Sequence, residues 1–162
     1  MPTTQLNFDN HGNLFPYEPI EVDLDTLEAY FVTAFPKSQT RKRLFENYLR
    51  YIYRFQDEVF PFFEQYINGS FVTKKENPKD IDIVTFLDYT VYEKREKSKT
   101  LDKFWAFSLE DKGIDAYLVR DYPTNHPFNI ETQQWKDYWS KLYSNNRNTT
   151  PSKGFLKITF EK

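Results

Sequence analysis

A Gly-Ser pair and two aspartates lie close together in the stretch GSFVTKKENPKDIDIV, residues 69–84. On a strand, the spacing of Asp80 and Asp82 places two carboxylates on the same side, because side chains alternate between faces. Such a pair suits a hard cation such as Mg²⁺, which prefers oxygen ligands and keeps waters and substrate phosphates in its other positions. Gly69 allows close approach to a phosphate, and the hydroxyl and N–H of Ser70 can donate to it. The stretch therefore predicts a metal and phosphate site, with a hairpin that carries solvated acids as the alternative.

A third carboxylate lies further along the chain, in GIDAYLV at residues 113–119. Asp115 interrupts an otherwise apolar segment, where a charge is costly unless something compensates it. A shared metal ion would do so, and three carboxylates on neighbouring strands are the usual requirement for two-metal phosphoryl or nucleotidyl transfer. Asp111 and Asp121 flank the same strand, so both remain alternatives for the third position.

The Asp-x-Asp spacing, Lys75 and Ser70 each have an alternative interpretation. A second Asp-x-Asp, Asp23 and Asp25, stands at an expected helix start, where acids favour the cap and the helix dipole, so the spacing alone is a weak signal. Lys75 could neutralise phosphate charge, although loop lysines are usually solvated. Ser70 as a hydrolase nucleophile would need a histidine base, and neither histidine of the chain has a supporting context.

The motif resembles the signature of the DNA polymerase beta nucleotidyltransferase superfamily: an apolar strand, Gly-Ser, about ten residues, Asp-x-Asp and a later aspartate. It is more narrowly similar to a family of small prokaryotic nucleotidyltransferase-like proteins of unassigned function. The matching residues are Gly69, Ser70, Phe71, Val72, Thr73, Lys75, Pro78, Asp80 and Asp82. The opening FDNHGNLFPYEP, with Phe15 where that family has a proline, and the aromatic C-terminal helix followed by Lys-Gly extend the resemblance over nearly the whole chain.

The resemblance implies that Gly69, Ser70 and Lys75 bind the triphosphate of an NTP such as ATP, and that Asp80, Asp82 and Asp115 are catalytic metal ligands. Two Mg²⁺ ions are expected, with Mn²⁺ as the alternative ion. The implied reaction moves a nucleoside monophosphate to an acceptor hydroxyl with release of pyrophosphate. The acceptor, whether RNA, protein or a small molecule, is not readable from the sequence, and its choice could depend on a protein partner or a second copy of the chain.

Two competing functions stay open. One is a catalytically silent module that binds a nucleotide or a partner, of the toxin–antitoxin or defence type. The other is a nucleic-acid binder that uses the polar face of the helix over 38–57, which is expected to carry Arg41, Lys42, Arg43 and Arg50. A net charge of -2 offers no global reason for tight binding to nucleic acid.

Composition bounds the class of protein. The chain has 162 residues, no cysteine and 19% aromatic residues, so it fits one domain with a core of large rings and has no disulfides or thiolate metal sites. No stretch reaches the roughly 18 apolar residues of a membrane span. We expect a cytoplasmic protein with no membrane partner.

The expected elements make an α+β domain over residues 1–162, with a small mixed sheet and helices packed against it, and the resemblance implies the nucleotidyltransferase fold, which is like the polymerase beta palm. Residues 1–22 are expected to form an extended arm, 23–59 two helices, and 60–162 the sheet, the motif, and a C-terminal helix and strand. FFEQYINGS reads as a strand that enters a turn at Asn68 and Gly69, and Thr73 as a strand residue. The elements are helices over 24–35, 38–57 and 131–142, strands over 81–87, 113–119 and 154–160, a solvated connection or short helix over 93–103, and a strand or buried helical turn over 104–109.

The C-terminal helix over 131–142 carries Trp135, Tyr138 and Trp139, with Tyr143 just beyond it. Aromatic side chains can stack on bases. Their helical spacing instead favours packing against the core.

Overall fold

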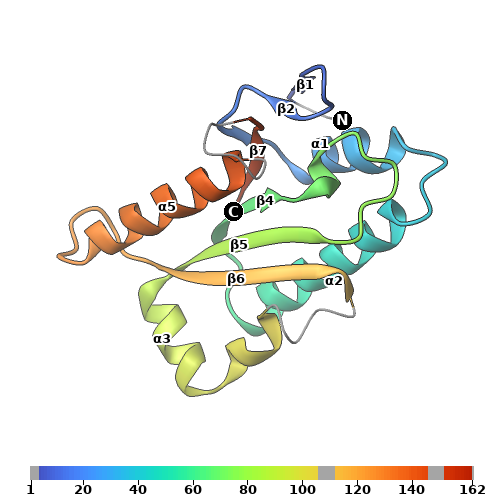
Figure 1. The fold of residues 1–162 in the computed structure, drawn as a ribbon. Helices are drawn as coiled ribbons and strands as arrows, with labels where there is room; N and C mark the ends of the chain where they lie inside the picture. The colour runs from blue at the N-terminus through green and yellow to red at the C-terminus, as the bar shows by residue number, and fades with distance from the viewer. Residues whose placement is uncertain (1–3, 106–111, 146–151, 162) are drawn as a thin grey trace.

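The computed structural model describes residues 4–105, 112–145 and 152–161. Its centre is a five-stranded mixed sheet with strand order β3-β7-β4-β5-β6 (Figure 1). The strands are β3 Pro19–Glu21, β7 Phe155–Phe160, β4 Phe63–Asn68, β5 Ile81–Asp88 and β6 Ile114–Asp121. The helices are α1 Leu24–Glu28, α2 Arg41–Glu58, α3 Tyr89–Lys97 and α5 Asn129–Ser144. The expected α+β class with a mixed sheet is confirmed.

The pairing of the central strands decides which residues become neighbours. β4 and β5 form the expected antiparallel hairpin, with Asn68 opposite Asp82. β5 and β6 run parallel, with Asp82 beside Asp115. β7 joins the other side of β4 antiparallel, and β3 runs parallel to β7. The two halves of the motif and the later aspartate therefore belong to three adjacent strands.

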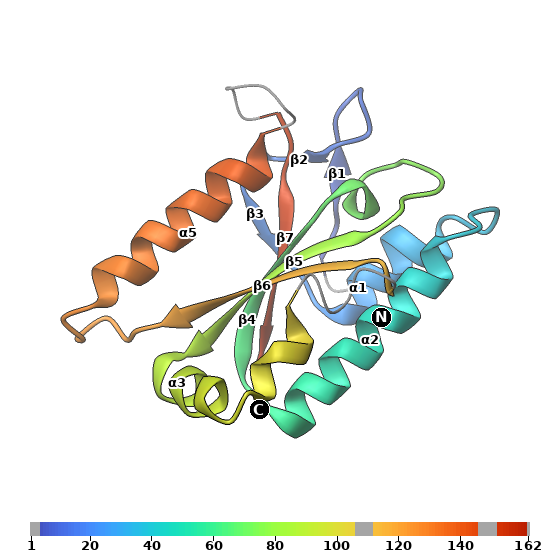
Figure 2. The same cartoon turned by 60° about the horizontal axis from the view of Figure 1, so that its bottom comes forward.

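One face of the sheet packs against α2, and the other packs against α5, so the sheet lies between them (Figure 2). α2 buries Leu44, Tyr48, Ile52 and Phe55, which recur at helical spacing and form one apolar stripe. On the sheet these side chains meet apolar residues of β4, β5 and β6 that belong to the larger core cluster, and the Tyr48 hydroxyl donates to the buried side chain of Gln65, at 2.7 Å. Burial of this stripe accounts for the long helix that the periodicity predicts.

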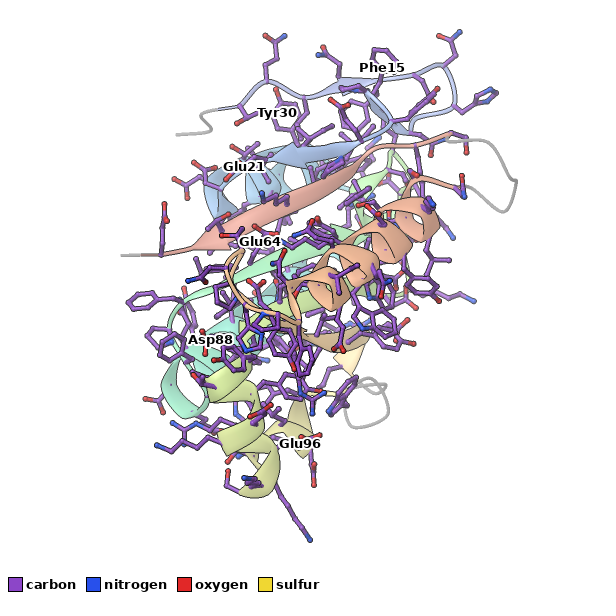
Figure 3. All side chains as sticks on the ribbon, turned by 90° about the vertical axis from the view of Figure 1, so that its left-hand side faces the viewer. Phe15, Glu21, Tyr30, Glu64, Asp88 and Glu96 are labelled. Carbon is purple, nitrogen blue, oxygen red and sulfur yellow. The ribbon has the colours of Figure 1, made fainter. Side chains whose placement is uncertain are left out.

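The opposite face carries a smaller core, made of Tyr66, Val84, Phe86, Val119 and Phe155 from the sheet with Trp139 and Tyr143 from α5. In Figure 3 the molecule is seen from this side, with α5 in front of the sheet and Glu64 and Asp88 labelled. Side-chain alternation puts Asn68, Asp82 and Asp115 on this face too, beyond the apolar cluster. The face is thus apolar in the middle and polar at its ends.

The helices differ from expectation at several boundaries. The first helix is α-helical only over Leu24–Glu28 and continues as a π-helix over Ala29–Thr33. Asp23 caps it, accepting from the N–H and the hydroxyl of Thr26 at 2.8 and 2.6 Å, as the capping interpretation predicts. For the segment 93–103 the short-helix alternative is confirmed, although α3 begins earlier, at Tyr89, and a 3₁₀-helix follows over Thr100–Phe104.

The N-terminal arm is more structured than expected. Strands β1 Asn7–Phe8 and β2 Leu14–Phe15 pair antiparallel, and β3 joins the main sheet at its edge. Of the segment 104–109, residues 106–109 lie outside the described residues, so the expected strand or helical turn is not assigned. No helix in the described ranges is long and apolar enough to cross a membrane.

Candidate active site

Three polar residues form a row across the sheet: Asn68 on β4, Asp82 on β5 and Asp115 on β6. Residues paired on neighbouring strands lie about 5 Å apart and project to the same face. The Gly-Ser turn follows Asn68 directly, so the phosphate-binding and metal-binding candidates meet at one end of the sheet. The strand pairing thus brings together Gly69, Asp82 and Asp115, as the sequence predicts.

Asp80 departs from the expected geometry. β5 begins at Ile81, so Asp80 precedes the strand and is exposed. The alternation argument, which requires both aspartates on one regular strand, was therefore wrong for it. Asp80 still lies close enough for its charge to raise the pKa of both Asp82 and Asp115. The three carboxylates form one electrostatic group, with Asp80 on its solvent side.

The charge of Asp82 is poorly compensated. Burial, followed by the charges of Asp80 and Asp115, raises the pKa of Asp82 to about 6, and Lys153 opposes this effect. Burial also raises the pKa of Asp115, with an opposing contribution from the Tyr117 hydroxyl and a further rise from Asp80. Mutual repulsion of partly buried carboxylates is costly without a cation. This end of the sheet is therefore a site where a divalent ion would lower the free energy of the folded chain.

Gly69 is required at its position by both conformation and space. Its φ of +86° lies in the left-handed half of the map, which other residues rarely adopt. A Cβ at Gly69 would lie 3.0 Å from Oδ2 of Asp82, so the backbone of the turn packs directly against that carboxylate. The group that approaches Gly69 closely in the structure is the carboxylate of Asp82, and the approach of a phosphate stays a prediction.

Ser70 begins a 3₁₀-helix over Ser70–Val72. Its carbonyl accepts from the N–H and the hydroxyl of Thr73, at 3.2 and 2.7 Å. Thr73 therefore closes a tight turn, and its expected place in a strand was wrong. Phe71 and Val72 are completely buried. The turn is anchored in the core, so it holds the backbone at Gly69 and Ser70 in place.

Arg41 is the main residue that sequence patterns misassigned. It was expected on the exposed basic face of α2, but its side chain is 0% exposed. The guanidinium donates to four backbone carbonyls, those of Phe31, Phe71, Thr73 and Lys75. Burial lowers its pKa to about 10, against the charge of Glu76, so it remains charged at neutral pH.

Arg41 therefore ties α2 and the first helical segment to residues 71–75, which we call the site loop. Arg41 lies three and seven residues before Leu44 and Tyr48, on the buried stripe of α2, whereas its neighbours Lys42 and Arg43 are exposed, so helical periodicity could have found it. Only the tertiary contacts show which carbonyls it binds. The basic surface proposed for nucleic acid is reduced to Lys42, Arg43 and Arg50.

Lys75 has an exposed side chain, while its backbone is held by Arg41 and by a bond from its N–H to the Thr73 hydroxyl, at 3.3 Å. Its side chain is thus available to a ligand. The neighbouring Lys74 is not equivalent, because its N–H donates to Gly12 and its ammonium lies over the ring of Phe8 in the N-terminal arm, 4.9 Å from the ring centroid.

The alternatives for the third carboxylate separate clearly. Asp121 ends β6, where its strand neighbour on β5 is Asp88. Asp121 follows Asp115 by six residues and so lies roughly 20 Å from it along the strand. Asp111 lies outside the described residues. Gly113 explains how Asp115 is placed: its carbonyl accepts from Ile81 at 2.8 Å, and a Cβ there would lie 2.4 Å from Leu44 of α2.

A cavity of about 570 Å³ opens beside the carboxylate row, between the sheet and α5. Two polar residues in its lining, Asn68 and Lys153, were not recognised from the sequence. Asn68 was assigned only to the turn, and Lys153 comes from a part of the chain far from the motif. Burial lowers the pKa of Lys153, and Asp82 opposes that shift. The pairing of β7 with β4 is what brings this lysine near the site.

Over the described residues, no three acidic, histidine or cysteine side chains converge closely enough to enclose a cation by themselves.

Comparison with known proteins identifies a family without assigning an activity. Residues 6–159 match a family of unknown function (DUF6932), so the chain belongs to that family. No curated protein and no solved structure matches it.

Proposed function

We propose that this protein is a metal-dependent nucleotidyltransferase with the polymerase beta palm-like fold, which transfers a nucleoside monophosphate from an NTP to an acceptor hydroxyl. The observation that supports the proposal most strongly is the row of Asp82 and Asp115 on adjacent strands, with the Gly69 backbone packed against Asp82. The fold and the chemistry both rest on this juxtaposition and on the resemblance of the motif.

The donor set fits Mg²⁺, with Mn²⁺ as a substitute. Asp82 and Asp115 supply carboxylate oxygens from the sheet, and Asp80 contributes from the solvent side. Mg²⁺ characteristically takes one or two carboxylates together with substrate phosphates, which suits an open site. Bound there, two ions would neutralise the charge that develops on the attacking and leaving oxygens.

The site loop and the Gly-Ser turn suit the triphosphate. The left-handed backbone of Gly69 leads directly into Ser70, whose hydroxyl and N–H can donate to a phosphate, and the exposed side chain of Lys75 and Lys153 in the cavity lining add positive charge. Arg41 acts at a distance from the substrate, since all its donors go to carbonyls. It is a positioning residue that keeps the phosphate-binding backbone rigid.

In the proposed reaction the acceptor oxygen forms a bond to the α-phosphorus, and the bond from that phosphorus to the oxygen bridging to the β-phosphate breaks. Pyrophosphate leaves with the bonding electrons, and the hydroxyl proton passes to a carboxylate, for which Asp115 is the candidate. The acceptor is RNA, a protein or a small molecule.

The test is calorimetric titration of a non-hydrolysable ATP analogue with and without Mg²⁺. Wild-type protein should bind in a Mg²⁺-dependent manner, and the double variant Asp80→Ala with Asp82→Ala should lose that binding. Asp121→Asn, on the same strand as Asp115 but at its far end, is the matched control and should bind as wild type. Circular dichroism would establish that each variant is folded.

Three other results would point elsewhere. Mg²⁺-dependent binding without pyrophosphate release, across RNA, protein and small-molecule acceptors, would support the silent module. No binding of ATP, GTP, CTP or UTP analogues would remove the nucleotide from the function. Strongly salt-dependent RNA binding that survives loss of Asp80 and Asp82 would favour the nucleic-acid binder.

A further inference from the structure

We propose that the cavity between α5 and the carboxylate row binds the nucleoside of the NTP, with the base stacked on Trp135 and Tyr138. This inference rests on the proposed function and adds to it the part of the protein that would recognise the base. It is carried by the exposed aromatic surface of α5 and by buried polar groups that lack partners around the same cavity.

The first observation is the exposure of α5. Trp135 and Tyr138 were expected to pack in the core, and that expectation was wrong: their exposed fractions are 48% and 51%. For Trp139 and Tyr143 the expectation of core packing is confirmed, because both are buried against the sheet. α5 therefore divides its aromatic residues between the core and the cavity, and exposed rings of this size beside charged groups need an explanation.

The rings on this surface are fixed by one another. Trp135 and Tyr138 meet edge to face, with centroids 5.6 Å apart at 89°, and Tyr138 meets buried Trp139 at 5.3 Å and 82°. Trp139 is in turn 5.0 Å from Tyr117, two residues after Asp115 on β6. A flat ring could therefore stack on a preorganised aromatic surface that begins at the carboxylates.

The second observation concerns hydrogen bonding. Asn68, Trp139, Tyr143 and Asn145 all line the cavity, and each carries a buried side-chain polar atom without a hydrogen-bond partner: Oδ1, Nε1, Oη and Oδ1. The first three residues are 4%, 7% and 4% exposed. Buried polar groups in folded proteins are usually paired with protein atoms or water, so these four atoms give the wall of the cavity hydrogen-bonding capacity that no described residue uses. The set includes both acceptors and an N–H donor, as the edge of a base or a ribose requires.

The volume and the position of the cavity fit a nucleoside. A cavity of about 570 Å³ lies in the usual range for small-molecule sites. Asp82 and Asp115 belong to its lining, and Asn68 directly precedes Gly69 in the chain. A ligand whose phosphates lie at Gly69 and Ser70 would thus enter this cavity with its nucleoside end.

A second cavity, of about 290 Å³, follows β6 on the far side of Tyr117 and Trp135. Its lining includes Arg120 and Glu131, but neither Asp82 nor Asp115. It does not adjoin the carboxylates, so it does not fit the nucleoside of a nucleotide bound at them.

The experiment compares two ligands that share the triphosphate and differ in the nucleoside. Calorimetry in Mg²⁺ would measure the affinity of a non-hydrolysable ATP analogue and of inorganic tripolyphosphate for wild type, Trp135→Ala and Tyr138→Ala. Tyr53→Ala is the matched control, because Tyr53 is an equally exposed aromatic residue on α2. Trp135→Phe would show whether a flat ring restores binding.

Wild type should bind the analogue more tightly than tripolyphosphate. Each alanine variant should weaken the analogue by roughly 10- to 100-fold, the usual effect of losing one stacking partner, and leave tripolyphosphate unchanged. Trp135→Phe should recover most of the loss, and Tyr53→Ala should behave as wild type.

The inference is overturned if Trp135→Ala and Tyr138→Ala bind the analogue as wild type does, a result that leaves the proposed function intact. It is also overturned if wild type binds both ligands equally. Failure of the proposed function looks different: analogue binding that requires Trp135 but neither Mg²⁺ nor Asp82 would retain the nucleoside cavity and end the transfer chemistry. Absence of binding to either ligand would overturn both.

Discussion

The sheet face under α5 has acidic residues at both of its ends, and the two ends differ in the partners that these residues have. We call Asn68, Asp82 and Asp115 the Asp82 end, and Glu64, Asp88 and Asp121 the Glu64 end. At the Glu64 end, Glu64 forms ion pairs with Lys136 and Lys157, at 3.4 and 3.2 Å. Asp88 caps α3, where it accepts from the N–H groups of Thr90 and Val91.

At the Asp82 end, no ion pair or helix cap involves Asp82 or Asp115 among the described residues. Burial and repulsion between the carboxylates raise the pKa of Asp82 and Asp115, although Lys153 opposes the shift of Asp82 and the Tyr117 hydroxyl that of Asp115. Burial also raises the pKa of Asp121 at the Glu64 end, where Lys136 opposes the shift and Glu64 and Asp88 add to it. Acids that support the fold have partners within the chain, whereas acids left to repel one another are candidates for an external cation.

The largest expected effect is the loss of folding stability when a residue that anchors one end of the sheet face is replaced. Arg41→Met should lower the free energy of unfolding by about 3–5 kcal/mol, because it leaves several carbonyls of the site loop and of Phe31 without their donor. Lys157→Met at the Glu64 end should cost less than about 1 kcal/mol, as expected for a partly exposed ion pair. Urea denaturation would measure both. Equal losses would mean that the guanidinium is not a special anchor of the site.

The next effect is a change in folding stability on neutralising one carboxylate, and it should have opposite signs at the two ends. Asp82→Asn should raise the stability of the metal-free protein by about 1–3 kcal/mol at neutral pH, because it removes a charge whose pKa is raised. Glu64→Gln should lower it by up to about 1 kcal/mol. Two decreases would contradict the contrast between the ends.

The pH dependence of that difference follows from the direction of the shift. Because the folded pKa of Asp82, about 6, exceeds its ordinary value, the folded wild type holds the proton more tightly. Wild type therefore loses this stability as pH rises through the window from about 4 to about 6, and Asp82→Asn does not. The difference in stability between the two proteins should be near zero below this window and largest above it. Thermal unfolding without divalent ions would measure it.

The smallest effect tests the structural role of the Glu64 end. Asp88→Ala should lower stability by about 1 kcal/mol through loss of the α3 cap. It should leave Mg²⁺-dependent binding of the ATP analogue unchanged, as calorimetry would show. A loss of binding would mean that the site extends along the whole face of the sheet.

Local patterns predicted a large part of this molecule. The period of two over residues 81–87 and the helical spacing in 38–57 correspond to β5 and α2: α2 buries one face against the larger core, and β5 buries alternate residues against the two core clusters on opposite faces of the sheet. The turn at Gly69 was also predictable, since its left-handed conformation favours glycine. The expected start of β5 at residue 81 is confirmed, but the alternation argument was applied to Asp80, one residue before it, where the backbone need not follow the period of the strand.

The sequence by itself determined the α+β class, the hairpin between β4 and β5, and the residues of the motif, since these depend on periodicity and turn chemistry close along the chain. Only the tertiary structure decided that Asp115 lies beside Asp82, that Arg41 is buried under the site loop, and that Trp135 and Tyr138 face a cavity. Each of these depends on contacts between segments far apart in the sequence. The pairing of β5 with β6 and the packing of α2 and α5 on opposite faces of the sheet create those contacts. Local periodicity assigns a side chain to one face of its own helix or strand, but it does not encode which segment that face will meet.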